Sequence, residues 1–357
     1  MMLRILFNSY PLLPVSQDSA GGAEQMLWTL ERELCRRGHR TAVAAPLGSK
    51  VSGELIPTGI PSDEADRLEQ RGAEHRAVAL GAIRQARERG TPFDLIHDES
   101  GMFWRNSAAQ IVEPMLATLH LPLPFYGMEA FENPAPKLSF NFVSASQRLA
   151  FCSRLPALAG AQVVANGIAV EDFPFRRIKG DYLLWLGRIC EEKGAHVAIR
   201  VAGSAGLPLI LAGRVYPFGS HRQYLRERIA PSLGDNVRLF DSPDFETKCR
   251  LLSGARALLL PVRDEETSSL VAMEAMACGT PVIAFRRGAL GEIVAEGETG
   301  FVVENEAEML QAVRRAGGIA AADCRRRAEE QFTAQRMATQ YEHVYAQMLN
   351  RKHTTAA

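Results

Sequence analysis

Short apolar runs alternate with longer amphipathic stretches along the 357-residue chain. This alternation is typical of βα units around a parallel sheet. In the first half, the apolar runs expected to be strands are residues 4–7, 41–45, 93–97, 115–120, 141–144 and 162–165. In the second half they are residues 182–186, 207–212, 236–240, 257–261, 281–285 and 300–303. The two similar sets predict an α/β protein with two similar sheets.

A polar stretch with proline and glycine, residues 172–180, lies between the two sets, and the expected linker between the domains is residues 168–181. The chain length also favours two domains, at about 100–200 residues per domain. We therefore predict an N-terminal Rossmann-like domain over residues 1–170 and a C-terminal one over residues 171–331. A long helical pattern follows, over residues 332–350.

The composition is that of an ordinary globular protein, with 46% hydrophobic and 23% charged residues. Lys plus Arg total 41 and Asp plus Glu total 41, so the formal net charge is zero. A neutral chain has no general electrostatic attraction for nucleic acid or for an anionic membrane, and we expect no nucleic-acid partner. Any anion-binding site must therefore be local.

The six cysteines are scattered, with neither a C-x-x-C pair nor zinc-like spacing. They are interpreted as reduced thiols of a cytoplasmic protein. The N-terminal apolar run is too short for a signal peptide, and no segment approaches the roughly 20 apolar residues of a transmembrane helix. We expect a cytoplasmic protein without a transmembrane segment, and leave peripheral membrane contact open.

Two glycines, Gly21 and Gly22, follow the first predicted strand and open an amphipathic helix that is expected to end at Gly38. Glycines in this place let a ligand approach the N–H groups at the positive end of the helix. The pair is not a G-x-G-x-x-G fingerprint, and two glycines before a helix are more often a turn. By itself the pair indicates phosphate binding only weakly.

Two cations follow the strand expected over residues 182–186. Arg188 and Lys193 therefore lie at the carboxyl end of a strand, where open α/β sheets bind ligands. Arginine can contact two phosphate oxygens at once and lysine supplies a point charge, which suits a diphosphate. As isolated cations they would instead be solvated at the surface.

A second strand, loop and helix follow about seventy residues later. Thr267 or Ser268 is the expected N-cap of this helix. The N–H groups of Ser269, Leu270 and Val271 are then expected in its first turn without an intrahelical acceptor. The sequence thus predicts a second cradle for an anion.

Two carboxylates flank this cradle, Glu266 before the helix and Glu274 within it. A carboxylate can accept hydrogen bonds from two vicinal hydroxyls, so the pair suits a nucleotide sugar with its hexose and ribose. Glu266 could equally be a surface acid stabilised by the helix dipole. Glu274 has apolar neighbours on both sides, and its burial would demand a partner.

In this order the motifs resemble the family-4 retaining glycosyltransferases, the glycosyl transferases group 1 of the GT-B fold. The segments that carry the resemblance are residues 21–24, 37–39, 94–97, 118–120, 166–168, 187–188, 193–194, 266, 274–281 and 297–301. The resemblance implies an α/β chain with two facing Rossmann-like domains and a deep interdomain cleft. It also implies that the C-terminal helix crosses back onto the N-terminal domain.

Roles for individual residues come from the resemblance. It implies that Arg188 and Lys193 hold the donor diphosphate, that Glu266 contacts the transferred hexose and that Glu274 binds the ribose. His120 would line the cleft beside the sugar.

The resemblance also places Gly22, with its neighbour Gly21, near the reacting phosphate. One segment departs from the family: many relatives have Pro-Phe-Gly where this chain has Thr267, Ser268 and Ser269. Backbone donors survive this change, but Ser269 lacks the conformational freedom of glycine. The preferred hexose therefore cannot be carried over.

The resemblance implies a retaining hexosyltransferase that uses a UDP- or GDP-hexose, with UDP-glucose as the first choice. The chain has no D-x-D motif, so we expect no metal at the diphosphate and no cofactor beyond the nucleotide sugar. The acceptor, a small molecule, a glycan or a lipid-linked group, would contact loops such as residues 9–20 and 121–137. Core packing explains the aromatic residues of the second loop equally well.

Two other functions fit parts of the pattern. A sugar-nucleotide epimerase of the same architecture would need acid and base groups that cannot be placed. A non-catalytic nucleotide-sugar binding protein would not need the full polar set. A dehydrogenase is disfavoured, because no dinucleotide fingerprint follows a strand.

Overall fold

A computed structural model describes residues 2–19, 21–62, 67–216 and 218–354, with side chains described as far as residue 350. The chain divides into two compact units. Unit 1 comprises residues 1–167 together with residues 334–357, and unit 2 comprises residues 168–333. Residues 168–181, expected to be a linker, thus lie within unit 2. Each unit is built on one parallel sheet, which confirms the α/β class.

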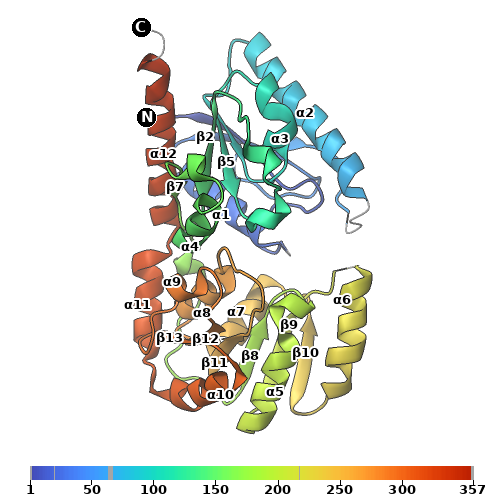
Figure 1. Ribbon diagram of the computed structural model, residues 1–357, viewed down its shortest axis with the longest axis vertical. Coiled ribbons are helices and arrows are strands. Elements are labelled where there is room, and N and C mark those ends of the chain that lie inside the picture. Colours follow the sequence, from blue (N-terminus) through green and yellow to red (C-terminus); the bar gives the residue numbers. More distant parts are fainter. Residues whose placement is uncertain (1, 20, 63–66, 217, 355–357) are drawn as a thin grey trace. The chain divides into compact units, whose positions relative to one another are not determined.

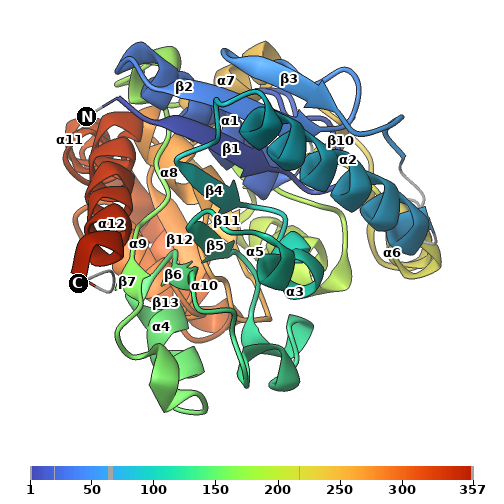
Figure 2. The ribbon, with the colours of Figure 1, turned by 90° about the horizontal axis from the view of Figure 1, so that it is seen from above.

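The sheet of unit 1 has the strand order β3-β2-β1-β4-β5-β6-β7. Its strands are β1 (Arg4–Asn8), β2 (Arg40–Ala45), β3 (Glu54–Pro57), β4 (Leu95–Asp98), β5 (Met115–Leu119), β6 (Leu138–Phe142) and β7 (Gln162–Val163). Figure 2 shows β1, β2 and β4 side by side. The expected six strands were one too few. The edge strand β3 was missed because its apolar run, Leu55 and Ile56, is too short to show an alternating pattern.

The helices of unit 1 cover both faces of its sheet (Figure 1). They are α1 (Gly22–Arg36), α2 (Leu68–Glu88), α3 (Phe103–Ser107), α4 (Ala145–Cys152) and α12 (Ala334–Thr354), with short 3-10 turns η2 (Ala108–Gln110), η3 (Leu123–Phe125), η4 (Glu129–Phe131) and η5 (Pro156–Leu158). On one face, Leu6 and Ile96 share a core with Ile83 of α2. Alternate strand residues point to opposite faces, so Phe7 and His97 lie on the face covered by α12.

Helix α12 is tied to unit 1 through buried polar contacts. The Tyr345 hydroxyl lies 2.8 Å from His97 Nδ1, and the Tyr341 hydroxyl lies 3.3 Å from Thr118 Oγ1. Closer to the solvent, Glu342 accepts a hydrogen bond of 2.7 Å from Arg37. Buried polar groups are costly unless paired, so this network specifies how the helix docks.

The proline-rich segment 121–137 is partly core and partly surface. Leu123, Tyr126 and Phe131 are buried in the core of unit 1. Leu121 and Phe125 are exposed, Phe125 by 70%. Core packing therefore accounts for three of the apolar residues in this segment, and Phe125 stays available at its surface.

The sheet of unit 2 has the strand order β10-β9-β8-β11-β12-β13, which Figure 1 shows in sequence across the unit. Its strands are β8 (Leu183–Leu186), β9 (Leu209–Gly213), β10 (Val237–Asp241), β11 (Ala257–Leu260), β12 (Val282–Phe285) and β13 (Gly300–Val303). All six were expected, within two residues at each end. The chain winds outward from β8 in one direction and from β11 in the other, so the order reverses between these two strands.

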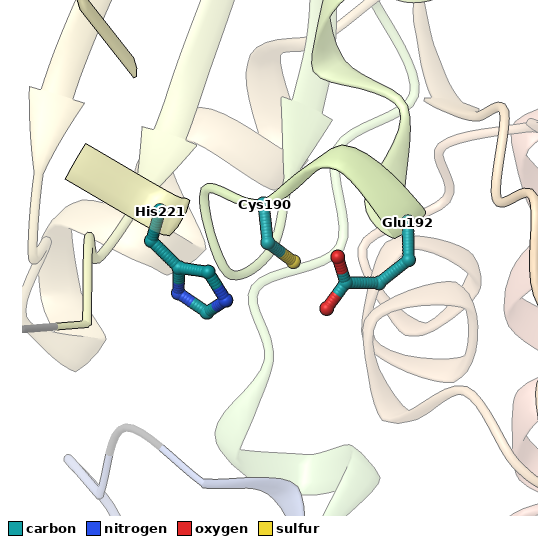
Figure 3. A group of neighbouring side chains, drawn as sticks. All are labelled: Cys190, Glu192 and His221. Atoms are coloured by element: carbon teal, nitrogen blue, oxygen red, sulfur yellow. The ribbon is translucent and has the colours of Figure 1, made fainter. Parts of the chain in front are cut away.

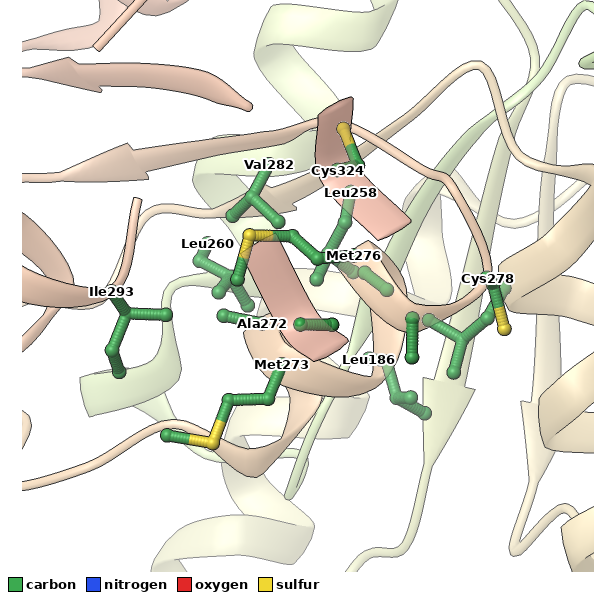
Figure 4. Packing of buried hydrophobic residues seen from close by; sticks show 14 of the residues in the cluster. Leu186, Leu258, Leu260, Ala272, Met273, Met276, Cys278, Val282, Ile293 and Cys324 are labelled. Carbon is green, nitrogen blue, oxygen red and sulfur yellow. The ribbon is translucent and has the colours of Figure 1, made fainter. Parts of the chain in front are cut away.

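The helices of unit 2 pack on both faces of this sheet. They are α5 (Ala195–Ala205), α6 (Gly219–Tyr224), α7 (Phe245–Gly254), α8 (Leu270–Ala277), α9 (Leu290–Ile293), α10 (Glu306–Arg315) and α11 (Ala321–Gln331), with a π-helical turn η8 (Leu225–Ile229) and 3-10 turns η6 (Val170–Asp172), η7 (Glu191–Lys193), η9 (Ala230–Ser232) and η10 (Ala316–Gly318). Figure 4 shows Met273 and Met276 of α8 among Leu186, Leu258 and Leu260 of the sheet. This packing holds α8 against one face of the sheet, beside the central strands β8 and β11.

All six cysteines are free thiols, and Cys190, Cys249, Cys278 and Cys324 are buried. Among the described residues, no helix is both long and apolar enough to cross a membrane.

Candidate functional site

The loops after β8 and β11 leave the sheet of unit 2 where its strand order reverses. The two strands are parallel neighbours, with Ala257 paired to Leu183 and Leu258 to Leu184. Their carboxyl ends therefore point to the same edge, and the crevice outside such a switch point is where open α/β sheets bind ligands. The expected cation loop follows β8 and the expected acidic loop follows β11. Topology thus brings together two segments that are about seventy residues apart.

Lys193 and Glu266 form an ion pair across this switch point. Lys193 Nζ lies 2.5 Å from Glu266 Oε2, and the two side chains are 26% and 15% exposed. The pair is half-buried and open to solvent on one side, so a ligand anion can replace the carboxylate as a partner of the ammonium group. The structure therefore places together two residues that were expected to contact the diphosphate and the hexose of one donor.

Two glycines hold these loops in close backbone contact. Gly194 has a positive φ of 73°, and a Cβ there would lie 2.1 Å from the carbonyl oxygen of Pro261. Gly288 has a φ of 51°, and a Cβ there would lie 2.2 Å from the carbonyl oxygen of Glu266. The Ala289 N–H also donates to that oxygen, at 2.7 Å. The backbone of Glu266 is therefore fixed by a loop that the motif analysis did not include.

Arg188 also lies at this edge, directly after β8. Its Nη2 is 3.5 Å from Glu192 Oε1, and its guanidinium lies 5.5 Å from the centre of the Tyr216 ring. Its side chain is 38% exposed. Surface ion pairs of this kind contribute little to stability. The guanidinium is therefore held in orientation and can still exchange Glu192 for an anionic ligand.

The N-terminus of α8 is one residue later than expected. Its N-cap is Ser269, whose Oγ accepts a hydrogen bond of 3.4 Å from the Ala272 N–H, so neither Thr267 nor Ser268 is the cap. All three have hydroxyls, and only the backbone conformation decides which one caps the helix. The N–H groups of Leu270 and Val271 then lie in the first turn, without an intrahelical acceptor.

Ser268 lies in the same loop with a buried hydroxyl. No donor or acceptor in the described part of the chain reaches its Oγ. A buried hydroxyl without a partner is costly in a folded protein, and ligand binding is one way to satisfy it. The loop that should contact the sugar thus presents one unsatisfied polar atom.

Glu274 is buried and paired, as its apolar surroundings require. It is 3% exposed, and its Oε1 accepts a hydrogen bond of 2.6 Å from Lys248 Nζ of α7. The ammonium group also lies 5.7 Å from the centre of the Phe173 ring and 5.3 Å from that of Phe245. One oxygen of Glu274 is thus paired with Lys248.

In unit 1, the glycine pair does open a helix. Gly21 is the N-cap of α1, in an extended conformation, and the helix begins at Gly22. A Cβ at Gly21 would lie 1.8 Å from Glu24 Oε2, so the close approach of that carboxylate requires glycine here. Glu24 is 4% exposed, and burial raises its pKa to about 7, although the nearby His120 partly lowers it. A carboxyl group that titrates near neutral pH therefore lies beside the glycine turn.

His120 follows β5 and is held by a buried carboxylate. Its Nε2 lies 2.6 Å from Glu99 Oε2, and Glu99 Oε1 lies 3.0 Å from His97 Nε2. Burial by itself would raise the pKa of Glu99, but the adjacent His97 and His120 outweigh it and keep the pKa well below its usual range. Glu99 is thus an ionised carboxylate that fixes the orientation of the His120 ring.

The motif analysis missed Glu99 and Lys248. Glu99 could have been found, because it directly follows a strand whose parallel neighbour ends beside His120. No feature of the sequence indicated Lys248, because it lies on an amphipathic helix, where lysines are usually solvated. The structure gathers Arg188, Lys193 and Glu266 on one edge of unit 2, and His120 with Gly21 and Gly22 in unit 1.

The fold as a whole is that of glycosyltransferases with two Rossmann-like domains, the GT-B class. Sucrose-phosphate synthase from Thermosynechococcus elongatus superposes with a TM-score of 0.80, at 21% identity over 98% of this chain and 100% of that one. AviGT4, a glycosyltransferase of avilamycin A biosynthesis, gives 0.73 at 21% identity over 98% of each chain. Anabaena HepE, solved with UDP-glucose, gives 0.75 at 16% identity over 97% and 100%. These similarities confirm the expected GT-B fold.

Within that class, residues 180–316 match the family model of the glycosyl transferases group 1. The match covers both loops of the switch point, as the motifs of the chain predicted.

Two curated relatives match the chain over different spans. Phosphatidyl-myo-inositol mannosyltransferase from Mycolicibacterium smegmatis is 27% identical over 318 residues, which is 81% of this chain and 79% of that protein. Glycogen synthase from Mycobacterium tuberculosis is 33% identical over 159 residues, which is 41% of this chain and 36% of the synthase. The chain thus matches only about a third of the glycogen synthase.

Proposed function

We propose that this protein is a retaining hexosyltransferase that takes its sugar from a nucleotide-diphosphate donor bound to unit 2. The observation that carries the proposal is the Lys193–Glu266 pair, with Arg188 beside it, at the switch point between β8 and β11. These groups lie within the segment that matches the family. They provide cations for a diphosphate and a carboxylate for sugar hydroxyls at one edge.

The cations would act on the leaving group. As the anomeric C–O bond breaks, negative charge grows on the departing phosphate oxygen, and Arg188 and Lys193 stabilise that charge more than the ground state. Lys193 exchanges Glu266 for the phosphate, which frees the carboxylate for the hexose. We propose that these two cations and the first turn of α8 do this without a metal bridging the diphosphate.

Glu274 and Ser268 would bind the rest of the donor. The carboxylate of Glu274 keeps one oxygen on Lys248 and offers the other to the ribose. The buried Ser268 hydroxyl, which has no partner among the described residues, would gain one from the hexose. This loop differs from the Pro-Phe-Gly of many relatives, so the hexose is proposed as glucose only because HepE was solved with UDP-glucose.

Unit 1 would supply groups for the acceptor. We propose that Glu99 holds His120 in one orientation as a positioning contact, and that Gly21 and Gly22 bring backbone N–H groups near the reacting phosphate. Retention would follow from attack on the same face of the sugar, with the departing phosphate taking the proton of the acceptor. The named acceptors of the relatives differ, so the acceptor is proposed only as a hydroxyl compound.

A screen of donors tests the proposal. The full chain is heated with UDP-, GDP-, ADP- and TDP-sugars, and a bound donor is expected to raise the melting temperature because it binds only the folded state. The best donor is then used in a transfer assay with inositol phosphate and with oligoglucan acceptors. Slow release of the sugar to water, without any acceptor, also counts as activity.

Three outcomes of these experiments would contradict the proposal. If no nucleotide sugar raised the melting temperature of the wild type, the donor site would be refuted. If a donor bound but was converted into its epimer, the chain would be an epimerase. Binding without transfer or hydrolysis under any condition would make it a nucleotide-sugar binding protein.

A further inference from the structure

Three side chains with metal-ligand atoms converge beside the cation loop of unit 2. They are Cys190, which precedes η7, Glu192 within η7, and His221 in α6. One ligand atom from each lies within 4.8 Å of the other two. Figure 3 shows the Cys190 thiol and the Glu192 carboxylate pointing toward one another, with the His221 imidazole beside the sulfur. The three residues come from two segments about thirty positions apart.

The surroundings hold these side chains in place. Cys190 is fully buried and His221 is 8% exposed, while the Glu192 side chain is 33% exposed. The Phe218 ring packs edge-on against the His221 ring, with 5.0 Å between ring centres. Among the described residues, no hydrogen-bond partner reaches the buried Nδ1 of His221. Glu192 is thus the most exposed of the three side chains, whereas Cys190 and His221 are held by packing.

The donor atoms select a particular class of ion. A thiolate, an imidazole nitrogen and a carboxylate oxygen are the ligands of Zn²⁺ and related ions, whereas Mg²⁺ and Ca²⁺ prefer oxygen ligands alone. In a tetrahedral zinc site the ligand atoms are about 3.5 Å apart, given bonds of about 2.0–2.3 Å. No pair of ligand atoms is more than 4.8 Å apart here, so each pair needs to close by about 1 Å at most.

The charges also balance. Ion binding would release the thiol proton of Cys190 to solvent as the sulfur–metal bond forms, giving one thiolate and one carboxylate against a dication. The neighbouring Arg188 would repel a bare dication but not a neutral site. Three protein ligands leave a fourth position for water, which is typical of exchangeable rather than closed zinc sites.

We propose that Cys190, Glu192 and His221 form a binding site for Zn²⁺ or a similar transition-metal dication. This site is separate from the diphosphate, where the proposed function needs no metal. The metal site is linked to the proposed diphosphate site through Glu192, whose Oε1 lies 3.5 Å from Arg188 Nη2. Metal binding draws Glu192 away from Arg188 and leaves the guanidinium available to a diphosphate. This last step rests on the proposed function, whereas the metal site does not.

Cobalt titration tests the metal site directly. The full chain is freed of metal with a chelator, the chelator is removed, and Co²⁺ is added while the absorption spectrum is recorded. One equivalent of Co²⁺ is expected to bind and to give a near-ultraviolet thiolate-to-cobalt band, which Zn²⁺ then removes by displacement. Absence of the band in the folded wild type would overturn the proposal.

Variants identify the ligands. Cys190→Ser is expected to abolish the band, and His221→Gln and Glu192→Gln are each expected to weaken Co²⁺ binding by about tenfold or more. Cys35→Ser is the matched control, because the Cys35 thiol also lies beside a carboxylate, 3.2 Å from Glu31. A band lost in Cys35→Ser but kept in Cys190→Ser would refute the assignment. If Cys190→Ser fails to fold, His221→Gln carries the same test.

The link to Arg188 has its own measurement. UDP binding is measured by calorimetry with and without one equivalent of Zn²⁺, and Zn²⁺ is expected to tighten it by about fivefold. His221→Gln should lose this effect, which excludes a complex of Zn²⁺ with UDP itself. Unchanged UDP affinity would refute the link while the cobalt band stands. If UDP fails to bind in either state, the donor proposal fails, and the metal site is judged by the cobalt band.

Discussion

The acidic groups of the candidate site have different partners in the two units of this protein. In unit 2, each acidic group of the candidate site is matched with a cation: Glu266 with Lys193, Glu274 with Lys248, and Glu192 with Arg188. In unit 1, the two buried carboxylates of the candidate site, Glu99 and Glu24, meet no lysine or arginine among the described residues. Glu99 lies between two histidines, and Glu24 is buried beside the glycine turn.

The two arrangements differ in whether a charged group can exchange its partner for a ligand. A cation paired with a carboxylate at a half-exposed edge can trade that partner for a phosphate without leaving a buried charge unpaired. A carboxylate buried among histidines cannot trade partners, but it can orient a ring or hold a proton. We therefore expect unit 2 to respond to loss of charge pairs and unit 1 to respond to pH and to ring orientation.

The largest effect is expected at the buried pair of unit 2. Lys248→Met leaves Glu274 charged and without its cation, and should lower the free energy of unfolding by about 3–5 kcal/mol in a urea titration. The double variant Lys248→Met/Glu274→Gln removes both charges and should lose less than Lys248→Met does. If the double variant lost at least as much free energy of unfolding as Lys248→Met, the ion pair between Lys248 and Glu274 would not explain the loss.

Next in size is the effect of the exposed cation on catalysis. Lys193→Ala should lower kcat for sugar transfer by about 10²–10³-fold, because one stabilising charge on the leaving phosphate is lost. The melting curve should hardly change, since the pair is partly solvated. Arg200→Ala is the control, because Arg200 is also a cation of unit 2 paired with a glutamate, Glu306, but lies away from the switch point. Equal losses in both variants would count against the diphosphate assignment.

The third prediction concerns pH and unit 1. Folding raises the pKa of Glu24 from about 4.5 to about 7, so the folded chain holds this proton more tightly than the unfolded chain. The resulting stabilisation is complete below about pH 4.5 and is lost as the pH rises through about 7. Glu24→Gln should therefore be more stable than the wild type at pH 8, by about 2–3 kcal/mol in urea titrations.

The control variant, Glu33→Gln, is expected to change the stability in the opposite direction. Burial would raise the pKa of Glu33, but hydrogen bonds from Arg36 and Arg37 lower it overall. Glu33→Gln should therefore destabilise the protein at pH 8. If Glu24→Gln also lost stability at pH 8, the fold would stabilise the carboxylate of Glu24, and its pKa would not be raised by burial.

The smallest effect is expected from the group that orients His120. Glu99→Gln keeps the size of the side chain but removes its charge, and should lower kcat by about 10–100-fold. The dissociation constant for UDP should stay the same, because the change lies in unit 1. Glu113→Gln is the matched control, since Glu113 is also a buried carboxylate of unit 1, paired with Arg87 at 2.9 Å. A weaker UDP affinity in Glu99→Gln would show a general structural defect instead.

Much of the fold could be predicted from the chain because parallel strands are buried on both faces. Their short apolar runs stand out, as in Leu183–Leu186 and Val282–Phe285, and glycines mark the turns around them. The edge strand β3 escaped because only one or two of its residues needed to be apolar. The helix cap was misplaced by one residue, since Thr267, Ser268 and Ser269 have the same capping chemistry.

The sequence by itself determined which residues have the chemistry of the candidate site, since Arg188, Lys193, Glu266 and Glu274 lie in motifs with recognisable spacing. It could not determine their partners. Lys248 meets Glu274, and Glu99 meets His120, only because parallel neighbours in a sheet end at the same edge and helices pack on a fixed face. Such contacts depend on strand order and helix docking, which many distant residues decide together. Motifs therefore gave the candidate groups of the site, and tertiary structure alone decided which residues hold them.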